Sequence, residues 1–156
     1  MGHRYHWALL VGPKTETQDA KGTRYHAKER LNPNGKSEWI FEEMEVRIQA
    51  TQMVLVRITV AKIENRDRVV NIVRKVPIRQ GEPGWNCVGW VKEALELLKA
   101  DEKALGTNVI EWVKVRNATM LYCQRKKDEH RFDGKGDFDT AKVATYDLME
   151  DKEIIR

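Results

Sequence analysis

Apolar and polar residues alternate along several stretches of the first third of the chain, and this alternation predicts β-strands. Successive side chains of a strand point to opposite faces, so a half-buried strand shows a period of two. Residues 53–63 are the clearest case, because Val56, Ile58 and Val60 recur at every second position. Turn residues, such as Asn-Pro-Asn-Gly at 32–35, separate the segments. We therefore expect strands at residues 5–12, 23–31, 39–46 and 53–63.

Three later segments have the spacing of amphipathic helices. Residues 86–99 are the strongest, since apolar side chains recur on one face at Val88, Val91, Ala94, Leu95 and Leu98. Residues 65–75 begin at Asn65, a good N-cap, and end before Pro77. A third helix is expected over residues 108–124, capped by Thr107. We expect a flexible loop at 133–139, a late strand at 143–146, and a tail at 147–156 that adds to this strand or is partly disordered.

The length and composition are those of one globular domain over residues 1–156. Hydrophobic residues make up 41% of the chain, and the charged 33% are mixed in sign, with a net charge of +4. A disordered chain instead combines low hydrophobicity with a large net charge. Basic residues alternate with acidic ones, as at 124–131, which is typical of a solvated helix face. We therefore expect no nucleic-acid partner.

Membrane insertion, secretion and metal binding find no support in the sequence. The longest apolar run, residues 7–11, is far shorter than the roughly 20 residues of a membrane span, and no signal peptide is recognisable. Cys87 and Cys123 form no CxxC motif, and His3 with His6 lacks a third metal ligand. We expect a cytoplasmic protein with no membrane span, metal or organic cofactor.

Cys87 is the most informative single residue. It falls in the first turn of the helix expected at 86–99, directly after a loop rich in glycine and proline. The free amides and the positive dipole end of a helix N-terminus favour a thiolate and can stabilise an oxyanion. The alternative is a buried, inert cysteine, which is common in protein cores.

Two histidines, His6 and His26, lie inside expected strands. If the first two strands pair, both rings can stand on one face of the sheet, and the helix bearing Cys87 can pack there. A thiol nucleophile needs such a base, and the base must be oriented. The alternative is that each ring is a half-buried strand histidine with its hydrogen bonds satisfied.

Three motifs together carry a resemblance to a known family. They are His6-Trp-Ala-Leu-Leu-Val-Gly12, Tyr25-His26 and Asn86-Cys-Val-Gly-Trp-Val91. The chain resembles the circularly permuted NlpC/P60 branch of the papain-like superfamily, most closely the lecithin:retinol acyltransferase-like and small phospholipase/acyltransferase group. The order His, His, Cys marks the permutation, and Val88-Gly89 stand where that group has Glu-His. As a whole the sequence is also similar to a fungal family of this size.

The resemblance implies a permuted papain-like α+β fold, in which the nucleophile helix packs on an antiparallel sheet of about four to six strands. Cys87 would be the nucleophile, His6 the general base and His26 the residue that orients the His6 ring. The Cys87 amide would supply one oxyanion donor. Substrate contacts would come from the aromatic and basic residues beside these positions, namely Trp85, Trp90, Tyr5 and Arg4. For Trp90 the alternative is a core residue that anchors the helix, and Trp39 and Trp112 are expected in the core.

The expected function is that of a cysteine-dependent hydrolase or acyltransferase. It would act through an acyl-enzyme on an ester, thioester or amide of a small molecule or lipid. One alternative is a peptide or isopeptide hydrolase. Another is a binding module that keeps the fold without the activity, for which the Val88-Gly89 departure is the best support.

Overall fold

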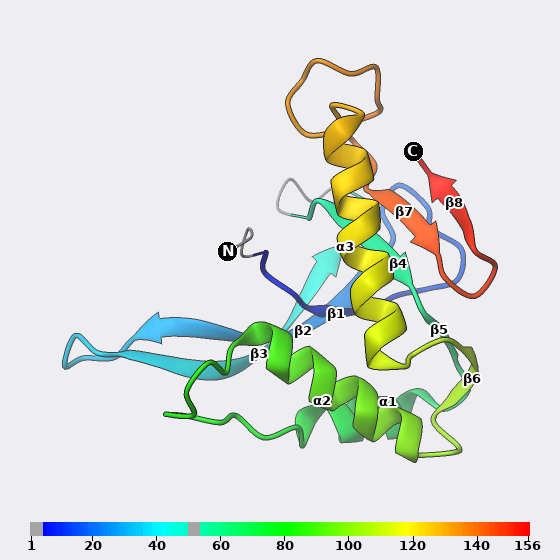
Figure 1. The fold of residues 1–156 in the computed structure, drawn as a ribbon. Helices are drawn as coiled ribbons and strands as arrows, with labels where there is room; N and C mark the ends of the chain where they lie inside the picture. The colour runs from blue at the N-terminus through cyan, green and yellow to red at the C-terminus, as the bar shows by residue number, and fades with distance from the viewer. Residues whose placement is uncertain (1–4, 50–53) are drawn as a thin grey trace.

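The computed structural model describes residues 5–49 and 54–156 of the chain. This part contains three small sheets and three helices, an α+β arrangement as expected (Figure 1). In chain order the elements are β1 (Leu9–Val11), β2 (Lys21–Leu31), β3 (Ser37–Arg47), β4 (Val56–Thr59), β5 (Ala61–Ile63), α1 (Arg66–Arg74), α2 (Cys87–Ala100), β6 (Leu105–Asn108), α3 (Trp112–Asp128), β7 (Ala144–Asp147) and β8 (Lys152–Ile155).

The first sheet is antiparallel, with the strand order β1-β2-β3. β2 and β3 form a long hairpin, whose tip projects from the rest of the molecule (Figure 1). The hairpin turns where Asn32 Oδ1 accepts hydrogen bonds from two backbone N–H groups of the loop, each at 3.0 Å. Gly35 adopts a φ of 78° there, a conformation that glycine reaches without steric strain.

The register of this hairpin decides which side chains share a face. His26 pairs with Glu42, and the next residues, Ala27 and Phe41, pair with each other. Paired residues lie on the same face, and neighbouring pairs lie on opposite faces. One face of β2–β3 therefore carries His26 and Glu42, and the other carries Tyr25, Ala27 and Phe41.

The hydrophobic core lies between this second face and the helices α1 and α2. Trp90 of α2 is fully buried, and its ring lies 5.9 Å from the Phe41 ring. The remaining buried members include residues from β2, α1 and α2, among them Tyr25, Ala27, Val69, Val73, Val91, Ala94, Leu95 and Leu98. Trp39 and Trp112 are partly buried against this cluster, as expected.

The C-terminal third forms a second, mixed sheet of order β4-β7-β8. β7 pairs in parallel with β4 and antiparallel with β8. The tail at 147–156 therefore contains a strand, β8, which closes this sheet. Residues 133–139 contain neither helix nor strand, and Asp133 and Asp139 each accept hydrogen bonds from backbone N–H groups of the loop.

Three expectations about the elements are wrong in detail. The strand expected at 53–63 is two strands, β4 and β5, separated by Val60; its first residue lies outside the described residues. The third helix begins at Trp112, with Glu111 as its N-cap, because residues 105–108 instead pair with β5 as β6. The expected single sheet of four to six strands is three separate sheets in the described part of the chain.

Candidate functional site

His6 and His26 meet, as expected from the pairing of the first two strands. The two ring atoms His6 Nε2 and His26 Nδ1 are 2.5 Å apart. The rings are nearly perpendicular, with centroids 4.8 Å apart. His26 is buried in the middle of β2, while His6, which precedes β1, is exposed. The pair therefore joins an inner ring, fixed by the sheet, to an outer ring that solvent can reach.

Glu42 completes a line of three hydrogen-bonded side chains. Its Oε1 atom lies 2.8 Å from His26 Nε2, because the two residues are cross-strand partners. The other carboxylate oxygen lies 2.6 Å from Lys28 Nζ, and Arg24 Nη2 is 4.0 Å from Oε1. Two cations of the same sheet face thus flank the carboxylate.

The charges of this cluster set the protonation states of its members. Hydrogen bonds from Lys28 and His26 lower the pKa of Glu42 to about 2. Partial burial lowers the pKa of His6, and the neighbouring His26 and Arg24 lower it further. Burial also lowers the pKa of His26, although its hydrogen bond with Glu42 acts in the opposite direction. Near neutral pH the cluster therefore holds one carboxylate and two neutral rings.

Glu42 was not among the residues expected from the sequence. The neighbouring pair Glu42-Glu43 shows no spacing that suggests a shared site. In the structure the hairpin loop covers residues 32–36 and Leu31 pairs with Ser37, which places Glu42 opposite His26. Counting outward from a turn at 32–35 would place Phe41 there instead, so the turn signal alone did not identify Glu42. Glu43 points to the other face, where it pairs with Arg74 of α1 at 2.8 Å.

Cys87 is the first residue of α2, as the sequence predicted. Asn86 is the N-cap, and its Oδ1 atom accepts a hydrogen bond from the Val88 N–H at 2.9 Å. The Cys87 side chain is a free thiol in a residue that is only 7% exposed. The environment is that of a helix N-terminus, where backbone amides favour a negative charge.

The structure does not bring this thiol into contact with the histidine pair. α2 packs on the face of β2 and β3 that carries Tyr25 and Phe41, whereas His26 and Glu42 lie on the opposite face. Within residues 5–49 and 54–156, no hydrogen bond joins Cys87 Sγ to His6 or His26. The expectation that α2 packs on the histidine face is therefore wrong, because the alternation of β2 directs Tyr25 and Ala27, rather than His26, toward the helix.

The loop before Cys87 is held by two tryptophans and a glutamine. The Trp85 and Trp39 rings meet edge to face, with centroids 5.5 Å apart. The Gln80 side chain accepts from the Trp39 N–H at 3.1 Å and donates to the Trp39 carbonyl. Gly89 allows this arrangement, because a Cβ atom there would lie 2.9 Å from Trp85 Cδ1. Packing against Trp85 therefore explains the glycine at position 89.

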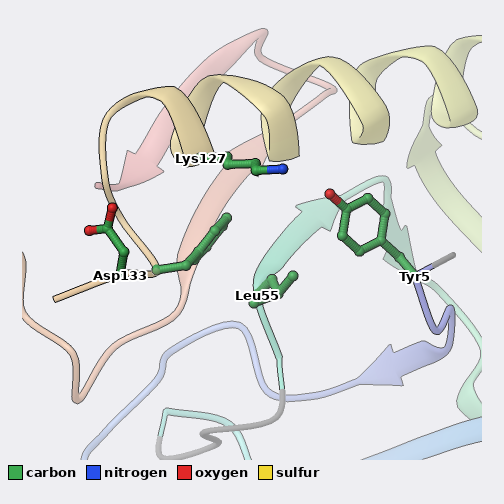
Figure 2. A pocket seen from close by; sticks show the side chains of 5 residues that line it. Tyr5, Leu55, Lys127 and Asp133 are labelled. Carbon is green, nitrogen blue, oxygen red and sulfur yellow. The ribbon is translucent and has the colours of Figure 1, made fainter. Parts of the chain in front are cut away.

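The remaining predicted substrate residues do not gather around one site. Complete burial assigns Trp90 to the core, which was one of its two expected roles. Tyr5 lines a cavity of about 320 Å³ together with residues from the segment before β4 and from the end of α3 and the loop after it, namely Leu55, Lys127, Phe132 and Asp133. Figure 2 shows Tyr5 and Lys127 directed toward each other across this cavity. Arg4 lies outside the described residues.

The fourth histidine and the second cysteine lie away from the histidine pair. His130 is exposed and its Nδ1 atom is 2.7 Å from Asp133. Cys123 of α3 is buried, and burial raises the pKa of its thiol. In the described ranges, no three His, Cys, Asp or Glu side chains are grouped so as to hold a metal ion. No helix there is both long and apolar enough to cross a membrane.

The fold and the site define an α+β protein with a hydrogen-bonded line of Glu42, His26 and His6, and with a separate cysteine at the start of α2. The chain belongs to the family of unknown function DUF6914, whose profile matches residues 2–155. Neither the curated proteins nor the solved structures contain a match to the chain.

Proposed function

We propose that this protein is a cysteine-dependent hydrolase or acyltransferase, with Cys87 as nucleophile and His6 as general base. The observation that carries the proposal is the His6–His26 pair, in which Nε2 of His6 is engaged. This leaves Nδ1 as the atom of an exposed, neutral ring that can take a proton. The spacing and order of the three motifs, with their likeness to permuted papain-like enzymes, add the nucleophile.

The reaction would proceed in two steps, the acylation of Cys87 and the release of the acyl group. The Cys87 thiol passes its proton to His6 Nδ1, and the sulfur attacks the carbonyl carbon of an ester, thioester or amide. As the tetrahedral intermediate collapses, the leaving group departs with the proton from His6. Water, an alcohol or an amine then gives its proton to His6 and attacks the acyl carbon. The C–S bond breaks, and His6 returns the proton to the departing sulfur, which restores the thiol. The Cys87 N–H, in the first turn of α2, is an oxyanion donor in both steps.

The proposal requires Cys87 Sγ to come within about 4 Å of His6 Nδ1 when the substrate is bound. Because α2 packs on the other face of the sheet, the start of α2 or the segment before β1 must move to bring the two atoms together. The second candidate function, a binding module without activity, is favoured by the packing of α2 on the other face of the sheet. A small-molecule or lipid acyl compound and a peptide or isopeptide are the two substrate classes to compare.

An activity panel of acyl esters, thioesters and peptide amides tests the proposal. We expect turnover of at least one class, a loss of about 100-fold or more in His6→Ala, and complete loss in Cys87→Ala. Cys123→Ala is the matched control, because it removes the other buried thiol, and it should retain activity. Turnover that survives Cys87→Ala, or no turnover of any class, would contradict the proposed mechanism and favour the binding module.

A further inference from the structure

The hydrogen bonds that join Glu42, His26 and His6 all run in one direction, because the carboxylate at one end can only accept. An ionised carboxylate only accepts hydrogen bonds, so the 2.8 Å contact with Glu42 Oε1 requires a proton on His26 Nε2. A neutral imidazole carries one proton, and His26 Nδ1 therefore accepts. The 2.5 Å contact then requires a proton on His6 Nε2. His6 Nδ1 is left as a lone pair.

We propose that Glu42 is a positioning residue that fixes the tautomers of His26 and His6, and that Lys28, which lies 2.6 Å from the Glu42 carboxylate, helps to keep His26 neutral. The catalytic meaning of this assignment depends on the proposed function, since only a base needs the lone pair on Nδ1. The tautomers themselves do not depend on it. Glu42 acts on the outer ring only through His26.

Lys28 opposes the protonation of His26 that Glu42 would otherwise favour. A carboxylate that is hydrogen-bonded to an imidazole favours the imidazolium form, and a doubly protonated His26 would donate from both nitrogens. It could then no longer accept from His6, and the lone pair of His6 would have to turn inward. Lys28 Nζ, at 2.6 Å from Glu42, offsets the carboxylate charge, and the charges of Arg24 and Lys28 both lower the pKa of His26. By favouring neutral His26, Lys28 thus preserves the hydrogen bond from His6 Nε2 to His26 Nδ1 that Glu42 determines.

The charged and titratable groups around His26 belong to β2, β3 and the segment before β1. They are Arg24 and Lys28 on its own strand, Glu42 on β3, and the His6 ring. Glu38 lies four residues before Glu42 on the same face of β3, where it pairs with Arg30 at 2.9 Å on an exposed part of the hairpin. It is therefore the matched control for removing Glu42.

Long-range ¹H–¹⁵N spectra of the full chain at pH 7.5 report the tautomer of each histidine ring. Peaks of the two rings are assigned by their loss in His6→Asn and His26→Asn. We expect protons on Nε2 of both rings in the wild type and in Glu38→Ala. Glu42→Ala should release His26 into a mixture of tautomers, and Glu42→Gln, which keeps a carbonyl acceptor, should restore the Nε2–H form. A wild-type His26 protonated on Nδ1, or unchanged tautomers in Glu42→Ala, would overturn the assignment.

The pH titration of the same peaks tests Lys28. Lys28→Met should raise the pKa of His26, whereas Glu42→Gln should lower it. If the His26 pKa does not move upward in Lys28→Met, the role of the cation is refuted.

Alkylation of Cys87 separates this proposal from the proposed function. If His6→Ala slows alkylation but Glu42→Ala leaves the tautomers unchanged, the positioning role fails and the enzyme mechanism stands. If the tautomers behave as expected but Cys87 reacts like an ordinary thiol, the mechanism fails and the positioning role stands. When both proposals hold, Glu42→Ala should slow alkylation about tenfold, which is the loss of one hydrogen bond to a charged group.

Discussion

Replacement of Glu42 by glutamine should destabilise the fold at neutral pH and much less in acid. The carboxyl is held by Lys28 at 2.6 Å and His26 at 2.8 Å, and its pKa falls from 4.5 to about 2. Because the folded pKa lies below the unfolded pKa, the ionised carboxylate contributes stability above pH 4.5. That contribution is lost as the pH falls from 4.5 toward 2.

The magnitude can be worked from the size of the shift. At about 1.4 kcal/mol per pKa unit, the fall from 4.5 to about 2 sets a ceiling of about 3.5 kcal/mol. The Glu42 side chain is 26% exposed and its partner Lys28 39% exposed, so solvent screening reduces this ceiling to an expected ~1–2 kcal/mol.

Urea denaturation at pH 7, 5, 4 and 3, for the wild type and Glu42→Gln in parallel, measures the effect. The difference in unfolding free energy should be largest at pH 7 and shrink by half or more by pH 3. Glu38→Gln, which removes a carboxylate from an exposed pair, should change stability by less than about 0.5 kcal/mol at pH 7. A difference for Glu42→Gln that stays constant from pH 7 to pH 3 would refute the electrostatic reasoning.

Three further substitutions test the supports of the site and of the fold by urea denaturation. Asn86→Ala removes the N-cap of α2 and should lower stability by about 1 kcal/mol; an unchanged midpoint would mean that the cap is replaced. Gly89→Ala places a Cβ 2.9 Å from Trp85. It should lower stability by about 1–3 kcal/mol and change the tryptophan fluorescence; a variant with the native spectrum and stability would contradict the close packing of Trp85 on Gly89. Lys126→Ala leaves two carboxylates beside a site where the wild-type side chain is fully buried, with an expected loss of about 3–5 kcal/mol; a loss below about 1 kcal/mol would show that the ion pairs do not matter.

Local signals in the sequence predicted much of the fold. Asn65 and Asn86 mark the starts of α1 and α2, because an N-cap acts only on the helical turn directly after it. The turn at 32–35 and the alternation on either side predicted the hairpin. These features depend on neighbours within a few residues, which a single sequence displays directly.

Pairing between distant segments was harder to predict. The alternation over residues 53–63 continues through Val60, yet the chain changes partners there, from β7 in parallel to β6 in antiparallel. Asn108 was expected to open the third helix, but it belongs to β6, where it pairs with Ala61 of β5. Periodicity and capping signals describe a segment by itself, and they do not identify the strand with which it pairs.

In the candidate site, too, local features were predicted better than contacts between distant segments. The meeting of His6 and His26 depends on the pairing of adjacent strands and was expected. The pairing of Glu42 with His26 depends on a loop at 32–36, which is one residue longer than the turn predicted at 32–35. The position of Cys87 relative to these rings depends on which face α2 covers. That choice is decided by Tyr25, Ala27 and Phe41 packing against Trp90, and the motif spacing does not encode it.

The pH–rate profile of iodoacetamide labelling at Cys87, read by mass spectrometry, tests the central claim most directly. If His6 takes the proton of Cys87, the wild-type Cys87 thiol should react at neutral pH faster than Cys123, and His6→Ala should slow the Cys87 reaction about tenfold or more by shifting its profile to higher pH. Labelling of Cys87 at the rate of an ordinary thiol, with the same profile in His6→Ala, would contradict the claim that His6 takes the proton of Cys87.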